Sequence, residues 1–178
     1  MSHRIIEVVE HDPEWASRFE QEKQLLQAAI GDCALKIEHI GSTAVRGLAA
    51  KPVIDILIEV ANLEELDRHQ GAIGSLGYVA RGENGIEGRR YFQKGGEQRS
   101  HHLHAFRRGD AHLMRHRAFR DYLMAHPDVA QAYGTIKRVA AIECKNDMTA
   151  YMQHKNRFIQ YHQQQAIACY DPMAGADL

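Results

Sequence analysis

An apolar run at residues 53–60 is the feature that most constrains the fold of this chain. Most of its residues are β-branched, which is typical of a strand that is covered on both faces. Asp55 lies inside the run, and a carboxylate in such a strand is costly to bury unless it is hydrogen-bonded, paired with a cation or bound to a metal. The sequence therefore predicts a central buried strand whose aspartate needs a partner, and Lys51 or Mg²⁺ could supply one.

The segments around this strand alternate between strand and helix patterns. Asp12-Pro13 is typical of a helix start, and apolar residues then recur at helical spacing as far as Ile30. Further strands are expected at 35–40, from Tyr78, and in a hairpin of 89–94 and 99–106 that turns at Gly95-Gly96. Further helices are expected at 63–76, 111–125, 129–143, and from 147 to beyond 159. We therefore predict an α+β fold, a mixed β-sheet with flanking helices and a helical C-terminal portion.

The length of 178 residues suits a single domain. We expect one domain at 1–165, with a strand-rich core at about 34–106, a helical part at about 111–165, and a loose tail at 166–178. The three cysteines include no C-x-x-C pair, so neither a disulfide framework nor a thiolate zinc site is indicated. Because no run of about 18 apolar residues occurs, we expect a cytoplasmic protein that does not cross a membrane.

The charges of the chain nearly balance, with 22 lysines and arginines against 23 aspartates and glutamates. A dedicated nucleic-acid-binding protein usually carries a strongly basic field, so nucleic acid is not indicated as a partner. Histidine is abundant instead, with twelve residues, several of them between positions 101 and 116. That cluster is the first indication of chemistry.

A turn of small residues, Gly41-Ser42-Thr43, follows the strand expected at 35–40. Such a turn lets a phosphate approach the backbone closely, and its hydroxyls can donate hydrogen bonds. Taken alone, it could be an ordinary turn, and Asp55 could simply cap a neighbouring backbone group. Twelve residues separate Ser42 from Asp55, and this spacing of a Gly-Ser pair and a strand aspartate resembles the signature of the nucleotidyltransferase superfamily.

A longer set of motifs resembles the GrpB-like family of that superfamily. The motifs that carry the resemblance are 39–45, Gly47-Leu48, Lys51-Pro52, 54–56, 99–104, 119–123, Tyr151, Lys155 and Phe158-Ile159. The resemblance covers most of the chain and implies a nucleotidyltransferase-like sheet. It also implies that Gly41 and Ser42 hold a nucleoside triphosphate, that a divalent metal ion binds at Asp55, and that a nucleotidyl group passes to an unknown acceptor. Some GrpB-like domains are fused to dephospho-coenzyme A kinase, which implies a possible link to coenzyme A metabolism. The oligomeric state is not indicated.

The chain departs from these patterns at two positions. Arg46 stands where the family usually has proline. Leu57 stands where transferases of the superfamily usually place a second carboxylate, two residues after the first. Glu59 shares the face of Asp55 but lies about 13 Å along an extended strand, too far to bind the same ion. A catalytically inactive module that binds a nucleotide or a phosphate is therefore an open alternative.

His102 and His104 alternate onto one face of an expected strand, about 7 Å apart. With Asp55 they could form a metal site, and imidazole suits a transition metal better than magnesium, although the superfamily resemblance favours Mg²⁺ over Mn²⁺ or Zn²⁺. They could equally hydrogen-bond to core groups or to Asp55 without any metal, or act as a base. His112 and His116, at i and i+4, are expected on an exposed helix face.

Arginines and lysines near the expected strands are candidates for phosphate binding. Lys155 could face the cleft, one helical turn from Tyr151, or extend outward while Tyr151 packs in the core. The candidate catalytic and metal-binding residues are Asp55, His102 and His104. The candidate residues for binding nucleotide or phosphate are Gly41, Ser42, Thr43, Lys51, Arg90, Arg99 and Lys155.

Overall fold

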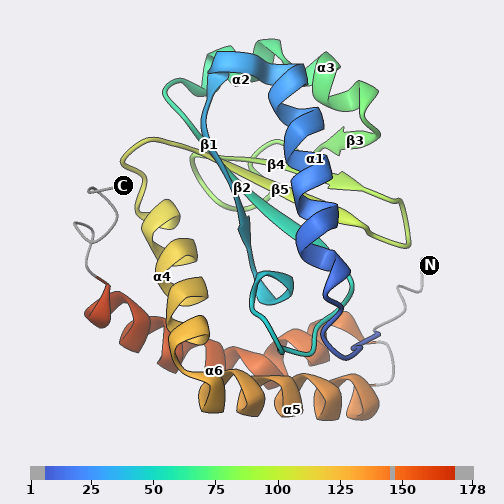
Figure 1. The fold of residues 1–178 in the computed structure, drawn as a ribbon, viewed down its shortest axis with the longest axis vertical. Helices are drawn as coiled ribbons and strands as arrows, with labels where there is room; N and C mark the ends of the chain where they lie inside the picture. The colour runs from blue at the N-terminus through green and yellow to red at the C-terminus, as the bar shows by residue number, and fades with distance from the viewer. Residues whose placement is uncertain (1–6, 145–146, 171–178) are drawn as a thin grey trace.

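A five-stranded mixed sheet lies at the centre of the protein, with the strand order β1-β2-β5-β4-β3 (Figure 1). The computed structural model describes residues 7–144 and 147–170. Strand β2 pairs in parallel with β5, and the other neighbouring strands are antiparallel. The strands are β1 (Ala34–Ile40), β2 (Ile54–Val60), β3 (Tyr78–Ala80), β4 (Arg89–Lys94) and β5 (His101–Arg107).

The helices lie around the sheet, along its faces and at the two ends of the molecule (Figure 1). Helix α1 runs along one face, while α5 and α6 lie at the end of the molecule opposite α2 and α3 (Figure 1). The helices are α1 (Glu14–Ile30), α2 (Leu63–Arg68), α3 (Gln70–Ser75), α4 (Ala111–Ala125), α5 (Pro127–Glu143) and α6 (Met148–Cys169), with short 3₁₀ turns η1 (Gly31–Cys33) and η2 (Ser42–Ala44). This arrangement confirms the predicted α+β fold with a helical C-terminal portion.

Alternation along β2 assigns its side chains to the two faces. Ile54, Ile56 and Ile58 are buried in the main core, together with apolar residues of α1, α2 and α3. Asp55, Leu57 and Glu59 lie on the other face, because successive side chains of a strand point in opposite directions. Asp55 is therefore placed on the side of the sheet that the C-terminal helices cover.

The two residues after Asp55 on its face are used for packing and for an ion pair. Leu57 is fully buried in a small cluster with Ile40, Phe106 and Leu113. Glu59, which is 7 % exposed, pairs with Arg117 of α4 at 3.4 Å. Position 57, where transferases of the superfamily usually carry a second carboxylate, therefore belongs to the hydrophobic core.

The helix expected at 63–76 is two helices, because the chain breaks at His69. Asn62 caps the first of them by accepting the Glu65 amide at 3.1 Å, as the capping pattern predicts. The His69 ring contacts the Glu65 carbonyl at 2.9 Å, and the His69 amide donates to the Leu66 carbonyl instead. The imidazole thus occupies the carbonyl that the helix ladder would have used.

Two boundaries near the C-terminus also differ from expectation. Helix α5 begins at Pro127 rather than at 129, because proline is well tolerated in the first turn of a helix. Helix α6 continues through 166–169, which were expected in the tail, because Ala166 is buried. The rest of the expected tail, 171–178, lies outside the described residues. In the part of the chain that the structure describes, no helix is long and apolar enough to cross a bilayer.

Candidate functional site

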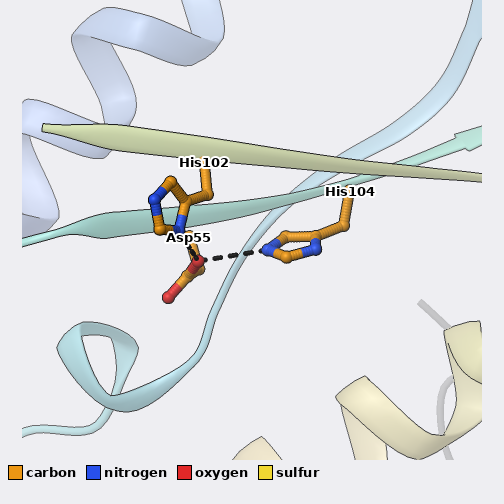
Figure 2. A group of neighbouring side chains, drawn as sticks. All are labelled: Asp55, His102 and His104. Carbon is orange, nitrogen blue, oxygen red and sulfur yellow. Dashed lines mark hydrogen bonds and ion pairs between the residues drawn. The ribbon is translucent and has the colours of Figure 1, made fainter. Parts of the chain in front are cut away.

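Asp55 is contacted by two histidines of the neighbouring strand (Figure 2). Its Oδ1 atom lies 3.3 Å from Nδ1 of His102 and 3.1 Å from Nε2 of His104. The parallel register pairs Asp55 with His102, and alternation brings His104 to the same face of β5. The structure therefore brings together the three residues that the sequence proposed as a group.

Hydrogen bonding sets the charge state of Asp55. Burial raises the pKa of its carboxyl, but the contacts from His102 and His104 outweigh burial and hold the pKa well below its ordinary value. The carboxylate is ionised and can only accept, so both ring nitrogens that face it carry protons in the free protein. The far nitrogens, Nε2 of His102 and Nδ1 of His104, are buried and have no hydrogen-bond partner among the described residues.

Gly41 holds the turn against Asp55. Its φ of 73° lies in the left-handed region that favours glycine. A Cβ at this position would lie 2.7 Å from Oδ2 of Asp55. Because no larger residue fits, the Gly41-Ser42 turn and the Asp55 carboxylate form one continuous surface.

That surface lines a pocket of about 370 Å³, a size typical of a site for a small molecule. Turn residues, the start of β2, His102 and residues of α4, α5 and α6 form its walls. The lining residues are Gly41, Ser42, Thr43, Ala50, Lys51, Val53, Asp55, His102, Phe119, Tyr133, Lys137, Met148, Tyr151, Met152 and Lys155. Several residues that were expected in the site line this pocket. They come from the turn, the loop before β2, β2 itself, β5 and α6.

Lys137 of α5 reaches the turn, although the sequence did not single it out. Its Nζ donates to Oγ of Ser42 and, at 3.2 Å, to the Ala49 carbonyl. It also lies 4.1 Å from the centroid of the Tyr133 ring. No local pattern could have indicated this role, because Lys137 and Ser42 are 95 residues apart and a lysine on a helix is usually exposed.

Two further lysines lie around Tyr151. Nζ of Lys51 is 5.2 Å from the centroid of the Tyr151 ring, and Nζ of Lys155 is 4.7 Å from it. Nζ of Lys51 also lies 4.0 Å from Sδ of Met148. Lys155 is 8 % exposed and Tyr151 is fully buried, and both side chains line the pocket.

Burial and mutual repulsion make the ammonium groups of the pocket easier to deprotonate. Burial, with repulsion from Lys155 and Lys51, lowers the pKa of Lys137 well below its usual value. Burial and repulsion from Lys51 lower the pKa of Lys155 to about 8, although attraction to Asp55 opposes the change. The pocket therefore carries an excess of positive charge at a cost that an anionic ligand would reduce.

Thr43 has a structural contact that limits its use in the site. Its hydroxyl donates to the Val53 carbonyl at 3.1 Å and lies 2.9 Å from Nε2 of His39. A hydroxyl has one proton, so Thr43 accepts a hydrogen bond from His39. The Thr43 hydroxyl links the turn to the strands and cannot donate to a phosphate while these bonds last, contrary to expectation.

Arg90 and Arg99, which were expected in the site, do not line this pocket. Arg90 is opposite Ala105 in the β4–β5 register, on the face away from His104, and pairs with Asp67 of α2 at 2.8 Å. Arg99 precedes β5, and its Nε donates to the Gly96 carbonyl in the turn of the hairpin. Strand alternation explains the first departure and the hairpin turn explains the second.

His112 and His116 were expected on an exposed helix face, but both are partly buried. His116 packs 5.5 Å from the ring of His104, and its burial lowers its pKa to about 4. His112 stacks on Phe106 at 5.1 Å and contacts Asp110 at 2.9 Å. The signal was available, because His116 is three residues after the buried Leu113 and so shares its helix face.

The donor set of Asp55, His102 and His104 fits a divalent metal ion. One ligand atom from each residue can be chosen so that all three lie within 4.8 Å of one another. Two imidazoles and one carboxylate suit a transition metal better than magnesium, which prefers oxygen ligands. Histidine ligands usually donate their outer N–H to a second group, which the described residues do not provide here. We therefore expect an exchangeable ion rather than a tightly held one.

The sheet, the helical C-terminal portion and the pocket between them define an α+β protein with a pocket between its sheet and its last helices. A sequence profile described as GrpB protein matches residues 5–165. The chain therefore belongs to the GrpB family, as its motifs predicted.

Individual relatives agree with this assignment. The crystal structure of conserved protein GrpB from Enterococcus faecalis superposes with a TM-score of 0.88 at 40 % identity, covering 91 % of this chain and 98 % of that one. YqkA of Bacillus subtilis (strain 168) is 40 % identical over 163 residues, which is 92 % of this chain and 48 % of YqkA. This chain thus spans about half the length of that relative.

A more distant similarity involves a kinase. Dephospho-CoA kinase of Mycolicibacterium paratuberculosis is 30 % identical over 175 residues, covering 84 % of this chain and 43 % of the kinase. The matching region is therefore less than half of that protein.

Proposed function

We propose that the pocket binds a nucleoside triphosphate with one divalent metal ion, and that the protein transfers a nucleotidyl group to an acceptor. The observation that carries this proposal is the contact between Gly41 and Asp55. Because of it, a turn suited to phosphate lines one pocket together with Asp55 and His102, two of the three candidate metal ligands. The third, His104, contacts Asp55 from β5. Family membership and the Gly-Ser spacing support the same assignment.

The proposal assigns roles to five residues in and beside the pocket. The Ser42 hydroxyl and the Lys51 ammonium bind phosphate oxygens, while Asp55, His102 and His104 hold the ion. When bound, the ion would offset the negative charge that develops on the phosphoryl oxygens. Mn²⁺ or Zn²⁺ suits these donors better than Mg²⁺. A nitrogen that binds a metal cannot also accept a proton, so the proposal assigns His102 and His104 to the ion and not to general-base catalysis.

A second candidate function is binding of the nucleotide without turnover. Leu57 favours it, because this fully buried residue occupies the position of the usual second carboxylate. A site with a single carboxylate has less capacity to hold the two ions of a two-metal mechanism. Incubation of the protein with the nucleotide that binds and with a set of hydroxyl-bearing acceptors, followed by assay of pyrophosphate release, separates the two functions.

A link to coenzyme A metabolism is a further proposal, and it rests only on the similarity to dephospho-CoA kinase. Coenzyme A and dephospho-coenzyme A carry linked phosphates, as nucleoside triphosphates do. Dephospho-coenzyme A therefore belongs in any screen of ligands for this pocket.

A thermal-shift screen tests the proposal. The purified protein is heated with ATP, CTP, GTP, UTP or dephospho-coenzyme A, each with Mg²⁺, Mn²⁺ or Zn²⁺. A ligand at a hundred times its Kd stabilises by about 2.7 kcal/mol, which raises Tm by roughly 5 to 10 °C in a domain of this size. We expect a metal-dependent shift with one nucleotide that Asp55→Ala abolishes and that Asp32→Ala, at an exposed aspartate, retains. If no nucleotide shifts Tm with any metal, the proposal fails.

A further inference from the structure

Positive charge is concentrated in the pocket beyond what the turn and the metal donors require. Among the residues that line it, three are lysines, Lys51, Lys137 and Lys155, and one is a carboxylate, Asp55. Asp55 is already contacted by two histidines. Lys137 and Lys155 are buried, and a buried ammonium group is costly unless an anion offsets its charge, so this composition favours an anionic ligand that contributes more than one negative charge.

The C-terminal helices deliver two of these lysines into the interior. Lys137 of α5 is 3 % exposed and Lys155 of α6 is 8 % exposed. Lys137 contacts Ser42, the residue of the turn that is suited to phosphate. Lys155 lies beside Tyr151, and Lys51 approaches the same ring from the loop before β2. The ammonium groups therefore extend from the turn along the wall that α5 and α6 form.

Tyr151 provides an independent indication of a ligand. Its side chain is fully buried in the wall of the pocket, and its hydroxyl has no hydrogen-bond partner among the described residues. A buried hydroxyl without a partner loses the hydrogen bonds that it makes to water in the unfolded chain, at a cost in stability. A ligand, or a water molecule ordered by one, would remove this cost.

We propose that Lys51, Lys137 and Lys155 form a subsite for two or more linked phosphate groups, with Lys137 and Ser42 at one end and Lys155 at the other. The identity of the ligand as a nucleotide rests on the proposed function, but the subsite itself requires neither a base nor a metal ion. Helices α5 and α6 are therefore part of the binding site and do more than support the sheet.

Proton uptake is a consequence of this subsite. The pKa of Lys137 lies well below its usual value and that of Lys155 is about 8. Lys51 and Asp55 act on both groups, and Lys155 also acts on Lys137. A phosphate anion stabilises the protonated ammonium, so binding at pH 8 draws protons from the buffer.

Calorimetric titration with inorganic pyrophosphate, in EDTA and without nucleotide, tests the subsite. We expect wild-type protein to bind pyrophosphate more tightly than orthophosphate, and Lys137→Met and Lys155→Met each to weaken pyrophosphate binding at least tenfold. Lys36→Met is the control, because Lys36 lies on β1 and is exposed. Absence of pyrophosphate binding to the wild type, or equal affinity in all four proteins, would overturn the proposal.

Two measurements on the wild type keep the test independent of the folding of the variants. The pyrophosphate affinity is expected to fall as KCl is raised. The binding enthalpy at pH 8 is expected to differ between Tris and HEPES in proportion to their ionisation enthalpies. An affinity independent of salt and an enthalpy independent of buffer would both count against the lysines.

The arms of the experiment separate this inference from the proposed function. Binding of pyrophosphate without metal, combined with failure of all four nucleoside triphosphates with all three metals, supports the subsite and rejects the nucleotide site. Titration with dephospho-coenzyme A then shows whether the linked phosphates belong to a coenzyme A precursor. Metal-dependent binding of ATP that is unaffected by Lys137→Met and Lys155→Met supports the proposed function and rejects the subsite.

Discussion

Gly41 and Asp55 are in direct contact across the turn and the central strand. A Cβ on Gly41 would lie 2.7 Å from Oδ2 and 3.1 Å from Cβ of Asp55. Since real Cβ atoms do not approach other atoms so closely, either the turn or the aspartate would have to move. The position of the turn and the position of the candidate metal ligand are therefore linked.

Gly41→Ala is expected to weaken both binding functions of the pocket. The substitution forces a side chain into a backbone conformation of φ 73° and ψ −173° that is essentially confined to glycine, which costs about 1 to 3 kcal/mol, and it displaces the Asp55 carboxylate. We expect a lower Tm and at least a tenfold loss of Mn²⁺ affinity, measured by thermal unfolding and calorimetric titration.

Gly47→Ala is the matched control for this prediction. Gly47 also has a positive φ, 81°, but a Cβ there would meet nothing within 4 Å. Its replacement is expected to cause a similar loss of stability with unchanged Mn²⁺ affinity. Equal losses of affinity in the two variants would mean that the contact between Gly41 and Asp55 has no special role.

His104→Ala is expected to reduce metal binding at Asp55. The Nε2 atom of His104 lies 3.1 Å from Asp55, and loss of one of three protein ligands removes a large part of the binding energy. Titration with Zn²⁺ or Mn²⁺ should show a Kd at least tenfold higher than in the wild type. His126→Gln, at an exposed histidine, should leave the Kd unchanged. Comparable affinities in all three proteins would place the ion elsewhere or rule out a site here.

Leu57→Asp is expected to unfold the protein rather than to add a metal ligand. Leu57 is fully buried against Ile40, Phe106 and Leu113, and a carboxylate there would put a charge into this apolar cluster. We predict a loss of about 3 to 5 kcal/mol in the free energy of unfolding, measured by urea denaturation. Leu57→Met should cost less than about 1.5 kcal/mol. A stable Leu57→Asp protein with tighter metal binding would show that position 57 belongs to the site.

Lys155→Met is expected to change the dependence of stability on pH. The pKa of Lys155 is about 8 in the folded protein against an ordinary 10.5, so the unfolded chain binds more protons between these values. Stability of the wild type should therefore rise relative to Lys155→Met as pH increases from 8 to 10.5, by roughly 2 to 4 kcal/mol in all. Below pH 8 the difference should stay constant. Parallel curves of urea stability against pH would contradict the altered pKa of Lys155.

The sequence was sufficient to predict most elements of the fold and the grouping of Asp55, His102 and His104. The β-branched run around Asp55 and the alternation of His102 and His104 are local patterns, and strand geometry converts them directly into a shared face. The Gly-Ser motif similarly placed the turn. These inferences succeeded because each depends on residues close together in the chain or on one familiar family pattern.

The sequence was insufficient where long-range packing decides the position of a side chain. Lys137 looked like any helical lysine until docking of α5 brought it to Ser42. Arg90 and Arg99 looked close to the strand cores, but the face of β4 and the turn of the hairpin direct them elsewhere. The break at His69 depended on a side chain that competes for a backbone carbonyl.

The central claim is that one pocket holds a triphosphate and a metal ion together. A crystal structure of the protein grown with Mn²⁺ and a non-hydrolysable analogue of the nucleotide that raises Tm tests it most directly. We predict an anomalous manganese peak between Asp55, His102 and His104, with phosphates against Ser42 and the pocket lysines. A manganese peak away from Asp55, or phosphates bound outside the pocket, would contradict the account.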